Sequence, residues 1–212
     1  MNFASWEAKF ESKISAIASS DDPAHDLLHF KRVVCLAKSL GERENGNTQI
    51  VIPAAWLHDL VILPKNNPLR GQASRLSAEK AIEFLRSIDY PAKFYNEIAH
   101  AIEAHSFSAN IEVKTIEAKI VQDADRLDGL GAIGIARCFA TAGLLKRAFY
   151  NLEDPFCTAR IPDDSHFTLD HFFCKLFKTA ETLKTKSGIE EGQKRVELMK
   201  NYLSSLRLEI LR

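Results

Sequence analysis

The sequence places a histidine and an aspartate side by side in an apolar run from Ala54 to Leu60. The doublet is His58-Asp59, and Pro64 ends the run that contains it. A buried aspartate needs a cation or hydrogen-bond donors around it. The adjacent imidazole makes a metal ion one candidate for that cation. A core histidine beside a capping aspartate is the alternative, and the doublet alone does not decide between the two.

Three further places in the chain supply metal-ligating side chains, each on a predicted helix of its own. They are His29, the pair His100 and His105, and the acidic run Asp123, Asp125 and Asp128. Imidazole and carboxylate together suit a borderline divalent ion such as Mn, Fe, Co, Ni or Zn. Oxygen ligands alone would instead indicate Mg or Ca. The combination favours a metal site assembled from several helices.

Most of the chain repeats its apolar residues at helical spacing. Helices are expected at about 3–19, 26–41, 48–63, 77–88, 91–105, 115–127, 135–150, 168–186 and 189–211. Segments 64–74 and 151–167 have the composition of loops, and no segment shows the alternation of a strand. We therefore expect one all-α domain of eight or nine helices over residues 1–212.

Composition places the chain among ordinary globular proteins. Lys and Arg number 28, as do Asp and Glu, and 46% of residues are hydrophobic, so a general nucleic-acid or membrane-surface binder is disfavoured. Four widely spaced cysteines without a CxxC pair are typical of reduced thiols in a cytoplasmic protein. No apolar run is long enough to cross a membrane, and the first residues lack the apolar core of a signal peptide.

The order of these motifs resembles the HD-domain phosphohydrolase superfamily, which is named for the doublet. The similarity extends to the stand-alone bacterial HD hydrolases of the YedJ and YpgQ type. It is carried by AHDLLHFKRV, WLHDLV, AHSFS, KIVQDADRLDGLGAIGIAR and DHFFCKL, from about residue 24 to residue 178. The resemblance implies a helical HD-domain bundle with core motifs at about 24–130, closed by C-terminal helices at 168–211. It also implies metal-dependent hydrolysis of a phosphate ester or anhydride.

The resemblance implies a set of four metal ligands. They are His29, His58, Asp59 and Asp125. Manganese is the ion expected first, with Mg, Fe, Co, Ni and Zn as alternatives. Asp123 and Asp128 compete for the last ligand position; on a helix Asp125 and Asp128 share a face, whereas Asp123 points away from both.

Proton transfer is assigned to three candidates: His100, His105 and Asp128. The two histidines are alternatively ligands of a second ion or structural residues. Asp128 is alternatively a salt-bridge partner of Arg126. Ser106 beside His105 is not expected to act as a nucleophile, because adjacent helical residues diverge.

Basic residues that follow the doublet are candidate phosphate ligands. Lys65, Arg70 and Arg75 lie on or beside a predicted loop, and loops at the mouth of a rigid site are where substrate contacts gather. Arginine forks match phosphate oxygens well. The alternative is that each is a solvated surface charge.

The resemblance implies a nucleotide substrate, first of all a (d)NTP cleaved to a monophosphate and pyrophosphate. The alternatives are phosphodiesterase or phosphomonoesterase action on another nucleotide, a non-catalytic metal-stabilised regulatory protein that binds nucleotides, and an oxygenase with paired iron. Neither a membrane nor a stable nucleic-acid partner is expected, and a homodimer is left open.

Overall fold

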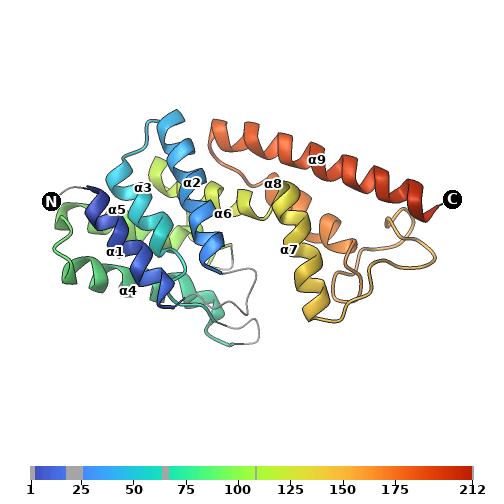
Figure 1. Ribbon diagram of the computed structural model, residues 1–212, viewed down its shortest axis with the longest axis horizontal. Coiled ribbons are helices and arrows are strands. Elements are labelled where there is room, and N and C mark those ends of the chain that lie inside the picture. The colour runs from blue at the N-terminus through green and yellow to red at the C-terminus, as the bar shows by residue number, and fades with distance from the viewer. Residues whose placement is uncertain (1–2, 18–25, 64–66, 108, 212) are drawn as a thin grey trace. The chain divides into compact units, whose positions relative to one another are not determined.

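The computed structural model describes residues 3–17, 26–63, 67–107 and 109–211 (Figure 1). In these ranges the chain forms nine α-helices and no β-strand, which confirms the predicted all-α class. One isolated bridge pairs Ala148 with Phe167. The helices divide into two compact units. The first is Met1–Asp125 with Lys184–Gly188, and the second is Arg126–Leu183 with Ile189–Arg212.

The first unit is built around one buried helix. It contains α1 (Phe3–Ser15), α2 (Leu27–Arg43), α3 (Thr48–Leu57), α4 (Ala73–Ser87), α5 (Tyr95–His105) and most of α6 (Ile116–Asp128), with short 3₁₀ turns η1 (Arg70–Gln72) and η2 (Ala92–Phe94). Helix α3 packs against α1, α2 and α5, and every residue from Ile50 to Leu57 is buried. Helix α4 packs chiefly against α5.

Helix α3 begins at the predicted residue, Thr48, but it ends earlier than predicted. Pro53 lies inside the helix, where it cannot donate a hydrogen bond to the carbonyl of Gln49. The hydroxyl of Tyr90 donates to that carbonyl instead, at 2.6 Å. The helix ends at Leu57 rather than at residue 63, so the doublet lies in the turn that follows and not within the helix.

Helix α2 is fixed at its start by an aspartate. The side chain of Asp26 accepts a hydrogen bond from the amide of His29 at 2.7 Å, which is N-capping of the usual kind. The helix continues past Gly41, where the sequence suggested a stop, and ends at Arg43. Gly41 is buried there, and a Cβ at this position would make an ordinary contact with Val51 of α3 at 3.8 Å.

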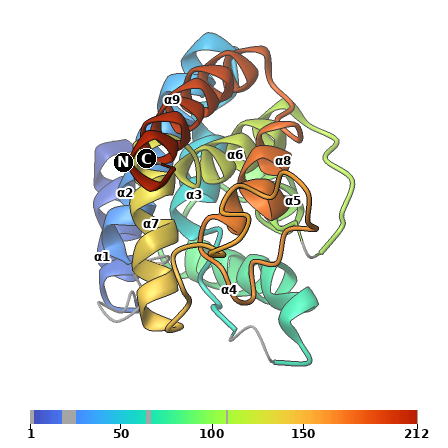
Figure 2. The same cartoon turned by 90° about the vertical axis from the view of Figure 1, so that its right-hand side faces the viewer.

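The second unit contains more irregular chain. It comprises α7 (Gly131–Leu144), the π-helical turn η3 (Phe172–Leu176), α8 (Phe177–Ala180) and most of α9 (Lys186–Ile210). Segment 151–167 lacks a helix, as predicted, and is visible as loops between α7 and α8 (Figures 1 and 2). The predicted helix over 168–186 is shorter than expected and ends at Ala180.

Two aspartates hold this long loop together. Asp154 accepts hydrogen bonds from the amides of Thr158 and Ala159, at 2.9 and 2.8 Å. Asp170 is fully buried and receives both terminal nitrogens of Arg160, at 2.5 and 2.7 Å. The loop therefore has a defined structure although it contains no regular element.

The described helices can be compared with the length and apolarity that a membrane-spanning helix requires. No single helix in the described part of the chain has the length and apolarity to cross a membrane; only α6 and α7 taken together, with a bend between them, reach that length and composition. The apolar residues Ile120, Val121 and Ala124 of α6 are fully buried in the first unit.

Candidate metal centre

Five side chains from four helical segments of the first unit converge on one place. They are His29 of α2, His58 and Asp59 after α3, His105 at the end of α5, and Asp125 of α6. Their ligand atoms form two overlapping groups, and within each group all atoms lie within 4.8 Å of one another. The first group is His29, His58 and Asp125, and the second is His58, Asp59 and His105.

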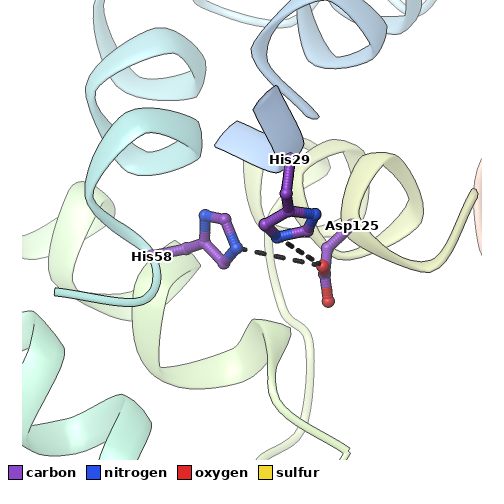
Figure 3. Close-up of side chains that lie close together, drawn as sticks. All are labelled: His29, His58 and Asp125. Atoms are coloured by element: carbon purple, nitrogen blue, oxygen red, sulfur yellow. Dashed lines mark ion pairs between the residues drawn. The ribbon is translucent and has the colours of Figure 1, made fainter. Parts of the chain in front are cut away.

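The distances within the first group are nearly equal. Nε2 of His29 lies 3.6 Å from Oδ1 of Asp125, and Nε2 of His58 lies 3.8 Å from the same oxygen. Figure 3 shows both imidazoles directed at that carboxylate. In the second group Nε2 of His58 lies 3.7 Å from Asp59 Oδ2, and Nε2 of His105 lies 3.4 Å from Asp59 Oδ1.

Backbone carbonyls set the orientation of two of the imidazoles. Nδ1 of His58 lies 2.8 Å from the carbonyl oxygen of Ala55, and Nδ1 of His105 lies 2.6 Å from that of Ile102. A carbonyl oxygen only accepts, so each Nδ1 is the protonated donor. Nε2 is then the atom turned towards the carboxylates, as in metal sites whose histidines are held by their other nitrogen. Sequence reasoning missed these two carbonyls, and their only signal is the three-residue spacing at a helix end.

The histidines of the cluster are more deeply buried than its carboxylates. His29, His58 and His105 are 1%, 0% and 4% exposed. The side chains of Asp59 and Asp125 are 20% and 29% exposed. The imidazoles therefore form the inner wall of the cluster, and solvent reaches it from the carboxylate side.

Two of the buried imidazoles, those of His58 and His105, have opposite pKa shifts. Burial lowers the pKa of His58 to about 4, so its ring is neutral at pH 7. Burial acts in the same direction on His105, but the hydrogen bond to Asp59 and the charges of Asp59 and Asp125 outweigh it and raise its pKa to about 9. Burial opposes ionisation of Asp125, and the neighbouring imidazoles more than compensate, so its pKa is lowered. Without an ion, the ring of His105 is therefore protonated at pH 7 and its charge faces Asp59.

The donor set fits a divalent metal ion. Nε2 of His58 is buried, and no described residue forms a hydrogen bond with it. A neutral imidazole that faces carboxylate oxygens needs a cation between them, because all of these atoms are acceptors. Ligands bound at about 2.0–2.2 Å from an ion lie about 3 to 3.5 Å from one another, close to the separations in this cluster. Mixed nitrogen and oxygen donors match Mn, Fe, Co, Ni or Zn.

The other proton-transfer candidates have partners of their own. His100 is half-buried, and its Nε2 accepts a hydrogen bond from the amide of Lys114 at 3.0 Å, so neither ligand group includes it. Asp128 is buried and forms an ion pair with Arg137 at 2.6 Å. Arg126 donates to the carbonyl of Thr182. Roles for His100 and Asp128 in proton transfer stay predictions.

The predicted phosphate ligands have different surroundings. Nη1 of Arg70 donates to the carbonyl of Leu63 at 2.6 Å, which ties its side chain to the loop after the doublet. Arg75 is exposed on α4. Lys65 lies outside the described residues. Neither arginine belongs to the ligand groups, and substrate binding by these residues stays a prediction.

Comparison with known proteins gives a consistent result. The family model described as HD domain matches residues 27–130, a range that includes all five cluster residues. YpgQ of Bacillus subtilis is 30% identical over 201 residues, which cover 93% of this chain and 90% of YpgQ. The crystal structure of YpgQ in complex with ADP has a TM-score of 0.75 at 32% identity, covering 96% of this chain and 97% of that one. A crystal structure of an HD-superfamily hydrolase from Bacillus thuringiensis has a TM-score of 0.75 at 31% identity, covering 97% of each chain.

Proposed function

From the premise that this chain belongs to the HD domain family and is a metal-dependent phosphohydrolase, we propose that it acts on nucleoside triphosphates. The reaction is cleavage of a ribo- or deoxyribonucleoside triphosphate between its α and β phosphates. The products are the monophosphate and pyrophosphate.

The cluster around His58 carries this proposal. A buried imidazole nitrogen that faces two carboxylates is suited to holding a cation, and a cation is what a polyphosphate substrate needs at its reacting phosphorus. YpgQ was crystallised with ADP, and this supports a nucleotide as the ligand here. The partly exposed carboxylates leave a side from which a phosphate group approaches.

We assign His29, His58, Asp59 and Asp125 as the ligands of the ion, with Mn²⁺ as the ion used. When bound, such an ion polarises a phosphate oxygen and makes a water molecule more acidic. The carbonyls of Ala55 and Ile102 hold the imidazoles of His58 and His105 in their orientations.

The chain's own groups then handle protons and phosphate charge. Nε2 of His105 lies 3.4 Å from Asp59, and this imidazole is our first candidate for delivering or accepting a proton during hydrolysis. Arg70, whose side chain is anchored to the carbonyl of Leu63, is proposed to bind the phosphates that do not react, and the same role is proposed for Arg75 and Lys65.

Product analysis tests this function. Mn²⁺-loaded protein is incubated with the common NTPs and dNTPs, with cyclic dinucleotides and with a generic phosphodiester, and the products are identified by chromatography. We expect a monophosphate and pyrophosphate in equal amounts from one or more triphosphates, and no turnover after chelation. Release of orthophosphate, or turnover of the diesters alone, would refute the assigned cleavage and name another phosphohydrolase substrate.

A further inference from the structure

Asp123 lies two residues before Asp125 on α6 and is fully buried. Its carboxylate does not enter the metal cluster. It accepts hydrogen bonds from the amide of Lys184, at 2.9 and 3.0 Å to the two oxygens, and from the amide of Thr185 at 2.7 Å. The hydroxyl of Thr185 donates to it as well, at 2.7 Å. One carboxylate is thus satisfied by three donors of a short segment more than sixty residues away.

The same segment begins helix α9. The hydroxyl oxygen of Thr185 accepts from the amide of Gly188 at 3.0 Å, which caps the first turn. The amide of Ser187 donates to Oε1 of Glu44 at 2.6 Å, at the end of α2. Residues Lys184–Gly188 are therefore attached to α6 through Asp123 and to α2 through Glu44. We call this segment the clasp.

The clasp belongs to the first unit although its neighbours on both sides belong to the second. The chain returns to the first unit for these residues alone, and it does so on the two helices that carry His29 and Asp125. Gly188 makes the close approach feasible. A Cβ at this position would overlap Oδ2 of Asp123 and lie 2.7 Å from the hydroxyl of Thr185.

Helical geometry connects the clasp with the metal cluster. A helix turns about 100° per residue, so Asp123 and Asp125 project about 200° apart. Gln122 fixes a further face, because its Nε2 donates to the carbonyl of Ala104 at 2.7 Å, next to His105. Because α6 is anchored on these faces, its rotation about its own axis is fixed. The side chain of Asp125 is then directed towards His29 and His58.

We infer that Asp123 is a positioning residue, which binds the clasp on one face of α6 and thereby aims Asp125 at the ion on the other. This rests on the proposed metal site. It assigns Asp123 to the clasp and not to the ion. It also gives Thr185, Gly188 and Glu44 an indirect part in ion binding, and neither ligand group contains Asp123 or Glu44.

The test measures ion binding directly. The Mn²⁺ dissociation constant is determined by chelator competition well below the unfolding temperature, and circular dichroism reports the folded fraction. Asp123→Asn places an amide group against the clasp amides, and Gly188→Ala pushes the clasp away from Asp123 without changing any residue of α6. We expect each to weaken Mn²⁺ binding by about 10-fold or more, the usual range for residues that orient ligands. The absorption spectrum of the Co²⁺-loaded protein should change as well.

Matched variants separate positioning from general stability. Gly143→Ala is the control for the glycine change, because a Cβ there meets nothing within 4 Å. It should leave ion affinity and the Co²⁺ spectrum unchanged. Thr185→Ser keeps the hydroxyl and should bind Mn²⁺ like the unmodified chain, whereas Thr185→Val loses it and should bind several-fold more weakly. This milder pair decides the matter if the stronger variants do not fold.

The outcomes are distinct. Unchanged Mn²⁺ affinity and an unchanged Co²⁺ spectrum in folded Asp123→Asn and Gly188→Ala would overturn the positioning role, as would equal affinities of Thr185→Ser and Thr185→Val. Absence of ion binding by both the unmodified chain and Gly143→Ala would instead defeat the metal site on which that role depends.

Discussion

Two regions of the molecule bury ionisable groups, and they do so in different ways. In the second unit, Asp170 receives both terminal nitrogens of Arg160 and the amide of Asp163, so every close partner is a donor. In the first unit, Nε2 of His58 faces the carboxylates of Asp59 and Asp125 at 3.7 and 3.8 Å, so acceptors face acceptors. The first arrangement is complete within the chain, and the second requires a cation from outside.

This difference separates a structural ion pair from a binding site. Burial alone does not, since Asp170 and His58 are both fully buried. The balance of donors and acceptors does, because a buried acceptor without a donor carries an unfavourable free energy that a bound cation removes. The proton of His105 offsets part of the negative charge, and the rest is available for an ion.

The largest effect is expected from His58→Ala. Its Nε2 belongs to both ligand groups, so its loss removes a donor from each. Substitution of residues that merely orient ligands weakens metal affinity by about 10- to 100-fold. For the loss of a ligand itself we expect Mn²⁺ binding to weaken by about 100-fold or more, with loss of turnover. His166→Ala is the control, because that histidine is 74% exposed in the second unit. Equal metal content of the two variants would contradict the assignment.

Asp170→Asn should affect stability and not ion binding. Breaking a buried pair leaves an uncompensated charge on Arg160, which we expect to lower the free energy of unfolding by about 3 to 5 kcal/mol. Asp163→Asn alters a surface pair and should cost about 1 kcal/mol or less. Urea unfolding of the metal-free proteins measures both, and chelator competition on the folded protein should give the unmodified Mn²⁺ affinity. A loss of Mn²⁺ affinity in Asp170→Asn would show that the two regions are not independent.

Metal removal should destabilise the chain by a smaller amount. An ion present at a hundred times its dissociation constant stabilises the folded state by about 2.7 kcal/mol. For a chain of this length that corresponds to a rise in Tm of about 5 to 10 °C. Thermal unfolding with Mn²⁺ and with chelator measures the difference. His58→Ala should show no such rise, and a full rise in that variant would place the ion elsewhere.

Thiol labelling tests how far solvent reaches the buried cysteines of the second unit, and it requires no substitution. Burial, followed by the hydrogen bond to Asp170 and its charge, raises the pKa of Cys157 to about 12. Burial raises the pKa of Cys138 to about 11. The thiolate is the reactive form, so both should be labelled at pH 8 at least about ten-fold more slowly in the native chain than in urea, and faster as the pH rises. Cys35 is exposed and serves as the internal control. Native labelling of Cys157 at the rate seen in urea would show that this region is open.

Residue type and spacing predicted the all-α class, whereas the set of metal ligands came from the resemblance to the HD-domain superfamily. Helical geometry also separated Asp123 from Asp125 correctly, but it did not reveal the partner of Asp123, because Lys184 lies 61 positions further along the chain. His100 and His105 looked equivalent in sequence, but in the structure His100 accepts from the amide of Lys114, whereas His105 faces Asp59. The end of α3 was placed too late, because the turn at His58 depends on a bond between its own ring and the backbone of Ala55.

The central claim is that His58 and Asp125 share a divalent ion, and crystals grown with Mn²⁺ test it most directly. Anomalous diffraction at the manganese edge locates the ion independently of activity. We expect one strong peak within bonding distance of Nε2 of His58 and of the Asp125 carboxylate. A cluster without a peak at saturating Mn²⁺, or a peak bonded to neither residue, would contradict the account.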